Sequence, residues 1–190
     1  MKIINSTIIF TFFLIIIILY NKYFKYEHFK DKVKIKNKVK IKDTKLIKKD
    51  SLDDKVIIIT GSTKGIGYNL AKTLSNFKTK LVINGRNQET IDKVVKELKK
   101  NNVNIIGIKA DVSLEEDVDI LFNKTIKEYG RIDILVNNAA INSGSRDLSR
   151  KKFQDWKKEL SVNVDAVFLL SQKVINYMRK NSIKGKIINV

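Results

Sequence analysis

The feature that most constrains this chain is a glycine-rich turn between an apolar run and an amphipathic stretch. The run Val56–Ile59 is β-branched and bounded by turn residues, which predicts a buried strand. The turn itself, Thr60–Gly67, reads Thr-Gly-Ser-Thr-Lys-Gly-Ile-Gly. The spacing of an amphipathic helix follows in Ile66, Leu70, Ala71 and Leu74. A strand, a glycine turn and a helix start together form a pyrophosphate site, because N–H groups at a helix N-terminus carry partial positive charge.

The order of glycines in this turn is Thr-Gly-x-x-x-Gly-x-Gly rather than the commoner Gly-x-Gly-x-x-Gly. In this form it resembles the turn of short-chain dehydrogenases/reductases, which transfer hydride between a nicotinamide cofactor and a carbonyl or alcohol carbon. The resemblance implies cofactor contacts from seven residues of the turn: Thr60, Gly61, Ser62, Lys64, Gly65, Ile66 and Gly67. The alternative is an ordinary strand-to-helix turn without a ligand, and the later motifs decide between them.

The turn after the second expected strand, residues 80–84, favours NADP over NAD. A dinucleotide fold selective for NAD usually has an acid there for the ribose 2′-hydroxyl, whereas an arginine accommodates a 2′-phosphate. Here the turn reads Asn84-Gly85-Arg86-Asn87 and contains no acid, and Lys64 adds a second cation. We therefore expect Arg86 to bind the 2′-phosphate of NADP; the alternative is a solvated turn arginine.

Two further motifs follow the third and fourth expected strands, residues 103–109 and 132–137. The resemblance implies that Asp111-Val112 holds the adenine end of the cofactor, whereas the alternative for Asp111 is a local turn acid. Ser113-Leu114-Glu115-Glu116 has the pattern of a capping box, which predicts a helix start at Ser113. Asn137-Asn138-Ala139-Ala140 resembles the family's Asn-Asn-Ala-Gly, which implies that Asn138 and Ala139 abut the cofactor, with Ala140 in place of the glycine.

The one catalytic residue that the resemblance assigns is Asn163, in a helical stretch expected over residues 153–179. Val162-Asn163-Val164 resembles the family helix whose Asn holds a water of the proton relay; the alternative is an Asn that faces solvent. The family's catalytic Ser and Tyr-x-x-x-Lys would follow the fifth expected strand, residues 185–190. Tyr-x-x-x-Lys does occur at Tyr26 and Tyr68, but we expect Tyr26 in a linker and Tyr68 on the side of its helix that faces away from the apolar side.

These motifs predict a Rossmann-type, doubly wound α/β domain over residues 51–190, with parallel strands in the order 3-2-1-4-5 and incomplete at the C-terminus. The expected function is an NADP-dependent oxidoreductase of a small carbonyl or alcohol substrate, nearest in motif style to 3-oxoacyl-carrier-protein reductases and able to form homo-oligomers. The alternative is a non-catalytic NADP-binding or interaction protein. We expect a truncated reading frame or a fragment rather than an evolved binding module.

The N-terminal quarter of the chain differs from the remainder in composition. We expect residues 1–21 to form a hydrophobic helix that serves as an anchor or signal segment, and residues 22–50 to form a basic linker. Residues 1–50 contain 13 Lys and 4 acids, half of the net charge of +18. By the positive-inside rule we expect a membrane-anchored chain whose domain faces the cytosol; the alternative is delivery to an organelle after cleavage of the signal-like segment.

Composition also argues against other functions. The chain has no Cys and one His, so neither disulfides nor a metal site are expected. Its basic charge is compatible with nucleic acid, but no arginine-rich or aromatic-interleaved motif accompanies it, and we expect no nucleic-acid partner.

Overall fold

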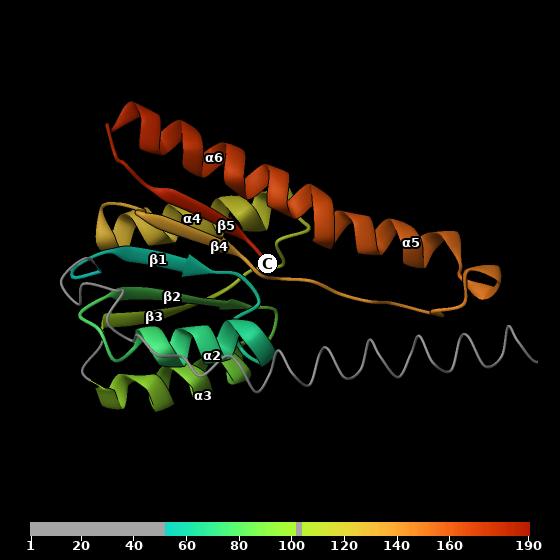
Figure 1. Ribbon diagram of the computed structural model, residues 1–190, viewed down its shortest axis with the longest axis horizontal. Coiled ribbons are helices and arrows are strands. Elements are labelled where there is room, and N and C mark those ends of the chain that lie inside the picture. The colour runs from blue at the N-terminus through green and yellow to red at the C-terminus, as the bar shows by residue number, and fades with distance from the viewer. Residues whose placement is uncertain (1–51, 102–103) are drawn as a thin grey trace, which may run out of the picture. The chain divides into compact units, whose positions relative to one another are not determined.

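A computed structural model describes residues 52–101 and 104–190, in which a parallel sheet carries helices on both faces (Figure 1). In this part of the chain the strands lie in the order β3-β2-β1-β4-β5, and every neighbouring pair is parallel. The strands are β1 (Val56–Ile59), β2 (Lys80–Gly85), β3 (Asn104–Lys109), β4 (Ile134–Asn137) and β5 (Lys186–Asn189). The expected doubly wound α/β fold and its strand order are thereby confirmed.

The helices connect successive strands as crossovers. They are α2 (Gly65–Leu74), α3 (Gln88–Leu98), α4 (Glu115–Tyr129), α5 (Phe153–Leu160) and α6 (Ala166–Lys180). Short 3-10 turns lie at Lys99–Asn101 and Leu148–Arg150, and a π-helical segment, Ser161–Asp165, joins α5 to α6. The helical stretch expected over residues 153–179 is therefore present, with a π-helical segment in its middle that the 3.6-residue periodicity did not predict.

Successive side chains along a strand point to opposite faces of the sheet, so the core has two layers. Ile57 and Ile59 of β1 pack on the side of α2 and α3, whereas Ile58 packs on the side of α4 and α6. Because both faces of the sheet are covered, β1 is buried at every position, as its unbroken apolar run predicted. In Figure 1, α2 and α3 lie below the sheet and α6 lies above it.

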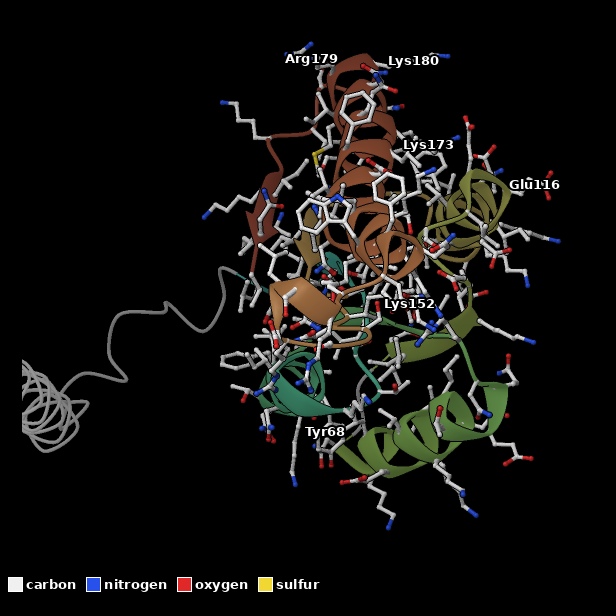
Figure 2. The ribbon with its side chains drawn as sticks, turned by 90° about the vertical axis from the view of Figure 1, so that its right-hand side faces the viewer. Tyr68, Glu116, Lys152, Lys173, Arg179 and Lys180 are labelled. Carbon is white, nitrogen blue, oxygen red and sulfur yellow. The ribbon has the colours of Figure 1, made fainter. Side chains whose placement is uncertain are left out.

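Helices α4 and α6 are joined by polar and aromatic contacts. Lys173 of α6 forms an ion pair with Asp119 of α4, and in Figure 2 the Lys173 side chain lies between the two helices. The rings of Phe122 and Tyr177 meet edge to face, with their centroids 5.6 Å apart. These contacts fix the layer that carries the long helical stretch, whose π-helical segment reaches the pocket described below.

The first helix differs from its predicted orientation. Ile66, expected on the apolar side, is 68% exposed and lines the pocket described below. Tyr68, expected to face away, is half-buried against the core under α2 and α3. Its hydroxyl donates to Glu97 Oε1 of α3 at 2.6 Å, and Figure 2 shows Tyr68 between these two helices.

The prediction of a membrane-anchored location needs correction. Within residues 52–101 and 104–190, no helix is both long enough and apolar enough to cross a bilayer. The longest helices there, α4 and α6, have 15 residues each, whereas a membrane span needs about 20 apolar residues. The segments on which the anchor and linker predictions rested, residues 1–21 and 22–50, lie outside the described residues.

Candidate functional site

A pocket of about 340 Å³ opens at the carboxyl ends of the strands. It surrounds the end of β1, which has β2 and then β3 on one side and β4 and then β5 on the other. Ligands of open α/β sheets bind at such a switch point. Each of the segments that follow β1 to β4 contributes to the lining, together with one residue of the π-helical segment. The lining residues are Gly61, Thr63, Lys64, Gly65, Ile66, Asn84, Gly85, Arg86, Ala110, Asp111, Val112, Asn138, Ala139, Ala140, Ile141 and Val162.

The N-terminus of α2 forms one side of this pocket. Its N-cap, Lys64, makes no side-chain capping bond, and no acid lies in the first turn. The N–H groups of the first turn are therefore available to a ligand, and the helix dipole favours an anion there. Gly65 has φ +62°, a left-handed conformation that turns the chain into the helix and that side chains rarely adopt. The local structure thus has the properties of a phosphate site.

Two hydroxyls of the glycine turn hold the wall of the pocket instead of lining it. Thr60 Oγ1 accepts from the backbone N–H groups of Asn138 and Ala139, both at 2.9 Å. Ser62 Oγ donates to the Ile59 carbonyl at 2.7 Å and accepts from the Asn84 N–H at 3.0 Å. Both side chains are buried. They tie the end of β1 to β4 and β2, so the cofactor contacts predicted for Thr60 and Ser62 stay predictions.

Two asparagine side chains connect the loops around the pocket. Asn84 Oδ1 accepts from the Gly61 N–H at 3.3 Å, and its Nδ2 donates to the carbonyls of Ile108 and Ala110. Asn138 Nδ2 donates to the carbonyls of Thr60 at 2.9 Å and Gly61 at 3.2 Å. The glycine turn is therefore held from both neighbouring strands, and its shape does not depend on a ligand.

Arg86 and Asp111 face each other in the wall on the β2 and β3 side of the pocket. Arg86 Nη1 lies 3.8 Å from Asp111 Oδ2, and the two side chains are 58% and 30% exposed. Lys64 lines the same pocket. The two predicted cations, Lys64 and Arg86, thus line one pocket. Asp111, which the family resemblance assigns to the adenine, lies beside Arg86.

The segment after β3 differs from the predicted capping box. Helix α4 begins at Glu115 rather than at Ser113, and its N-cap Leu114 makes no side-chain capping bond. Ser113 instead donates to Asp111 Oδ1, from its N–H at 3.1 Å and from its hydroxyl at 2.7 Å. The Asp111 N–H donates to Asp117 Oδ2 at 2.6 Å. Ser113 is turned back toward Asp111. Asp111 therefore accepts hydrogen bonds within its own turn, as the alternative interpretation of this residue expected, and it also lines the pocket.

Asn163 lies in the π-helical segment and binds the loop after β4. Its Oδ1 accepts from the Ile141 N–H and its Nδ2 donates to the Ile141 carbonyl, each at 2.9 Å. The side chain therefore does more than face solvent. Asn163 does not line the pocket, although its neighbour Val162 and its partner Ile141 do. Its predicted catalytic role stays a prediction.

The structure thus gathers nine of the thirteen predicted site residues around one pocket and sets four outside its lining. Those outside are Thr60, Ser62, Gly67 and Asn163. The sequence interpretation missed seven lining residues: Thr63, Asn84, Gly85, Ala110, Ala140, Ile141 and Val162. Asn84 had a signal that could have identified it, because an amide at the last positions of an otherwise apolar strand must find hydrogen bonds.

Comparison with known proteins yields one consistent group. The family model described as short chain dehydrogenase matches residues 55–190. The chain is 32% identical over 140 residues to glucose 1-dehydrogenase 2 of Bacillus subtilis, and the matched region covers 73% of this chain and 54% of the relative. It is 38% identical over 138 residues to the 3-oxoacyl-[acyl-carrier-protein] reductase of Buchnera aphidicola, and the matched region covers 72% of this chain and 54% of that protein.

A solved structure supports the same grouping. The crystal structure of a 3-ketoacyl-(acyl-carrier-protein) reductase from Brucella melitensis, complexed with NADH, matches with a TM-score of 0.68 and 30% identity. The match covers 73% of this chain and 57% of that protein. The chain spans about half the length of the curated relatives it matches.

Proposed function

Because this chain belongs to the short chain dehydrogenase family, we propose that its pocket binds NADP and that it is the cofactor-binding part of an oxidoreductase. The observation that carries the proposal is the meeting of two cations, Lys64 and Arg86, with an uncapped helix N-terminus in one pocket. A helix N-terminus suits a pyrophosphate, and an arginine at the end of the second strand suits a 2′-phosphate.

The lining residues fit the parts of such a cofactor by their chemistry. The N–H groups of Gly65 and Ile66 would bind the pyrophosphate, and Arg86 with Lys64 the 2′-phosphate. Asp111 and Val112 would contact the adenine. A bound nicotinamide supplies the carbon that gives or takes a hydride. NAD is the competing cofactor, since the solved reductase from Brucella melitensis is complexed with NADH.

For the reaction we propose hydride transfer to or from a carbonyl or alcohol substrate, with Asn163 holding a water of the proton relay. The Asn163 side chain spends one donor and one acceptor on Ile141, and keeps one N–H and one lone pair for such a water. In a form of the chain that includes the family's Ser and Tyr-x-x-x-Lys after β5, an Asn163→Ala variant that binds NADPH normally but oxidises it more slowly with a carbonyl substrate would support this role; an unchanged rate would refute it.

A second candidate function is NADP binding without catalysis. Within the described residues the one Tyr-x-x-x-Lys match is Tyr68 with Lys72, on α2. Its hydrogen bond to Glu97 raises the pKa of the Tyr68 phenol, which opposes acid–base work at neutral pH. By the family resemblance, the Ser and Tyr-x-x-x-Lys would follow β5, so the assay uses a form of the chain that includes them. Oxidation of NADPH by that form in the presence of a 3-oxoacyl thioester favours the enzyme, and tight NADPH binding without oxidation favours the second candidate.

The test of cofactor choice is a fluorescence titration of the full chain with NADPH and with NADH. We expect NADPH to bind more tightly, and Arg86→Met and Lys64→Met each to weaken NADPH binding about tenfold with little effect on NADH. Lys152→Met is the matched control, because Lys152 is exposed and does not line the pocket. Equal affinities for the two cofactors, or an equal effect of Lys152→Met, would contradict the proposed preference for NADP.

A further inference from the structure

The pair formed by Arg86 and Asp111 connects two neighbouring strands across the wall of the pocket. Arg86 follows the end of β2 and Asp111 follows the end of β3, and these parallel strands are in register from Lys80 and Asn104 onward. Nη1 and Oδ2 are 3.8 Å apart. At this distance the two groups are an ion pair without a short hydrogen bond, so the guanidinium keeps its donors for another anion.

The carboxylate of Asp111 is held in place by its own turn. Oδ1 accepts both the N–H and the hydroxyl of Ser113, while Oδ2 faces Arg86. The Asp111 N–H is fixed in turn by Asp117. Because these bonds orient the carboxylate independently of any ligand, its negative charge stays beside Arg86 when the pocket is filled.

We propose that Asp111 determines cofactor specificity by competing with a 2′-phosphate for the guanidinium of Arg86, which moderates the preference for NADP over NAD. This inference rests on the proposed function. A phosphate on Arg86 would share the guanidinium with a carboxylate, and two anions near one cation repel each other. A 2′-hydroxyl carries no charge and meets no such repulsion. Lys64 makes no ion pair within residues 52–101 and 104–190, so no carboxylate competes with a 2′-phosphate for its ammonium group.

The experiment measures the ratio of the NADPH and NADH dissociation constants by fluorescence titration of the full chain. The variants are Asp111→Asn, Arg86→Met and the double variant. Asparagine keeps an acceptor for Ser113 and removes the charge. Any contact of residue 111 with adenine is common to both cofactors and cancels in the ratio.

We expect Asp111→Asn to lower the ratio of NADPH to NADH dissociation constants about fivefold, the size of an exposed charge interaction. In the Arg86→Met background the same change should leave the ratio within about twofold, because the two residues act as a pair. The effect of Asp111→Asn should shrink in about 1 M salt, where charges are screened.

Glu116→Gln is the matched control, because it also removes one negative charge, and Glu116 lies exposed in the first turn of α4 and does not line the pocket. It should leave the ratio unchanged. A ratio that is unchanged or raised by Asp111→Asn, or that falls equally with and without Arg86, would overturn the inference while NADPH binding itself persists. A wild-type chain that binds neither dinucleotide would overturn the proposed function, and this inference with it.

Discussion

At the scale of single residues, Gly67 shows how closely the glycine turn packs on the neighbouring strand. A Cβ at this position would overlap Asn138 Nδ2 and lie 2.9 Å from the Gly61 oxygen. That amide nitrogen donates to the carbonyls of Thr60 and Gly61. The last glycine of the motif therefore serves the close approach of helix and strand, which keeps the first turn of α2 at the pocket.

We expect Gly67→Ala to lower the free energy of unfolding by about 1–3 kcal/mol, because an added methyl group must displace Asn138 or the turn. NADPH binding should weaken as well, since the displaced turn carries the phosphate site. Urea unfolding and NADPH titration measure the two effects. Thr73→Ala, on the exposed side of the same helix, should stay within about 0.5 kcal/mol of wild type. A Gly67→Ala variant as stable as Thr73→Ala would refute the packing argument.

At the scale of elements, the loop after β4 is fastened to the long helical stretch at two points. Asn163 binds Ile141 through both polar groups of its side chain. Further along, Glu159 Oε1 accepts from the Ser143 N–H at 2.6 Å and from Lys151 Nζ at 2.7 Å. The loop therefore has a defined course beside the pocket, although its sequence is polar and unpatterned.

The contacts of Glu159 with Ser143 and Lys151 predict that the stability of the fold depends on pH. The hydrogen bond from Lys151 and the Ser143 N–H lower the pKa of Glu159 below its ordinary value of 4.5. A lowered pKa in the folded state stabilises the fold above the unfolded pKa, and this contribution is lost as the pH falls below 4.5 and through the folded pKa. Acidification should therefore destabilise wild type more steeply than Glu159→Gln, as measured by urea unfolding between neutral pH and pH values below 4.5.

The control for that measurement is Glu116→Gln. Glu116 lies on α4 with its side chain exposed, and it forms no ion pair with another described residue (Figure 2). This variant should keep the pH dependence of wild type. Parallel curves for wild type and Glu159→Gln would show that the pair contributes nothing to stability.

The elements that the sequence predicted best are those specified by local patterns. The apolar run of β1 and the glycine turn after it predicted a strand, a turn and a helix, and the strand order followed from the family resemblance. The features that were missed depend on contacts distant in sequence. Asn163 meets Ile141 across 22 residues, and Asn84 reaches Ala110 across 26. Ser113 does not cap α4, because its N–H and its hydroxyl both bond to Asp111 Oδ1 and the helix begins only at Glu115, which a capping pattern does not reveal.

At the scale of the whole molecule, the outer side of the long helical stretch carries large apolar side chains. Phe153 and Trp156 of α5, Val164 of the π-helical segment and Phe168 of α6 are all exposed. Their spacing of three, eight and four residues places them along one side of the stretch. Several large apolar side chains exposed along one side of a helical stretch suit an interaction site, which supports the proposal that the chain forms homo-oligomers.

We expect the chain to self-associate with rising concentration, and Phe168→Lys to shift it toward the monomer by placing a charge in the apolar surface. Sedimentation velocity over a range of concentrations measures both. Thr73→Lys adds the same charge on α2, on the opposite face of the sheet, and should leave the association unchanged. A wild-type chain that is monomeric at all concentrations would contradict the proposal.

The central claim is that a dinucleotide binds where the glycine turn enters α2, and the most direct test is an amide NMR titration of the full chain with NADP. We expect the largest shifts at Gly61, Gly65 and Ile66, and the next largest at Arg86 and Asp111 across the pocket. Shifts confined to other surfaces, such as the contact between α4 and α6, or no shifts at saturating NADP, would contradict it.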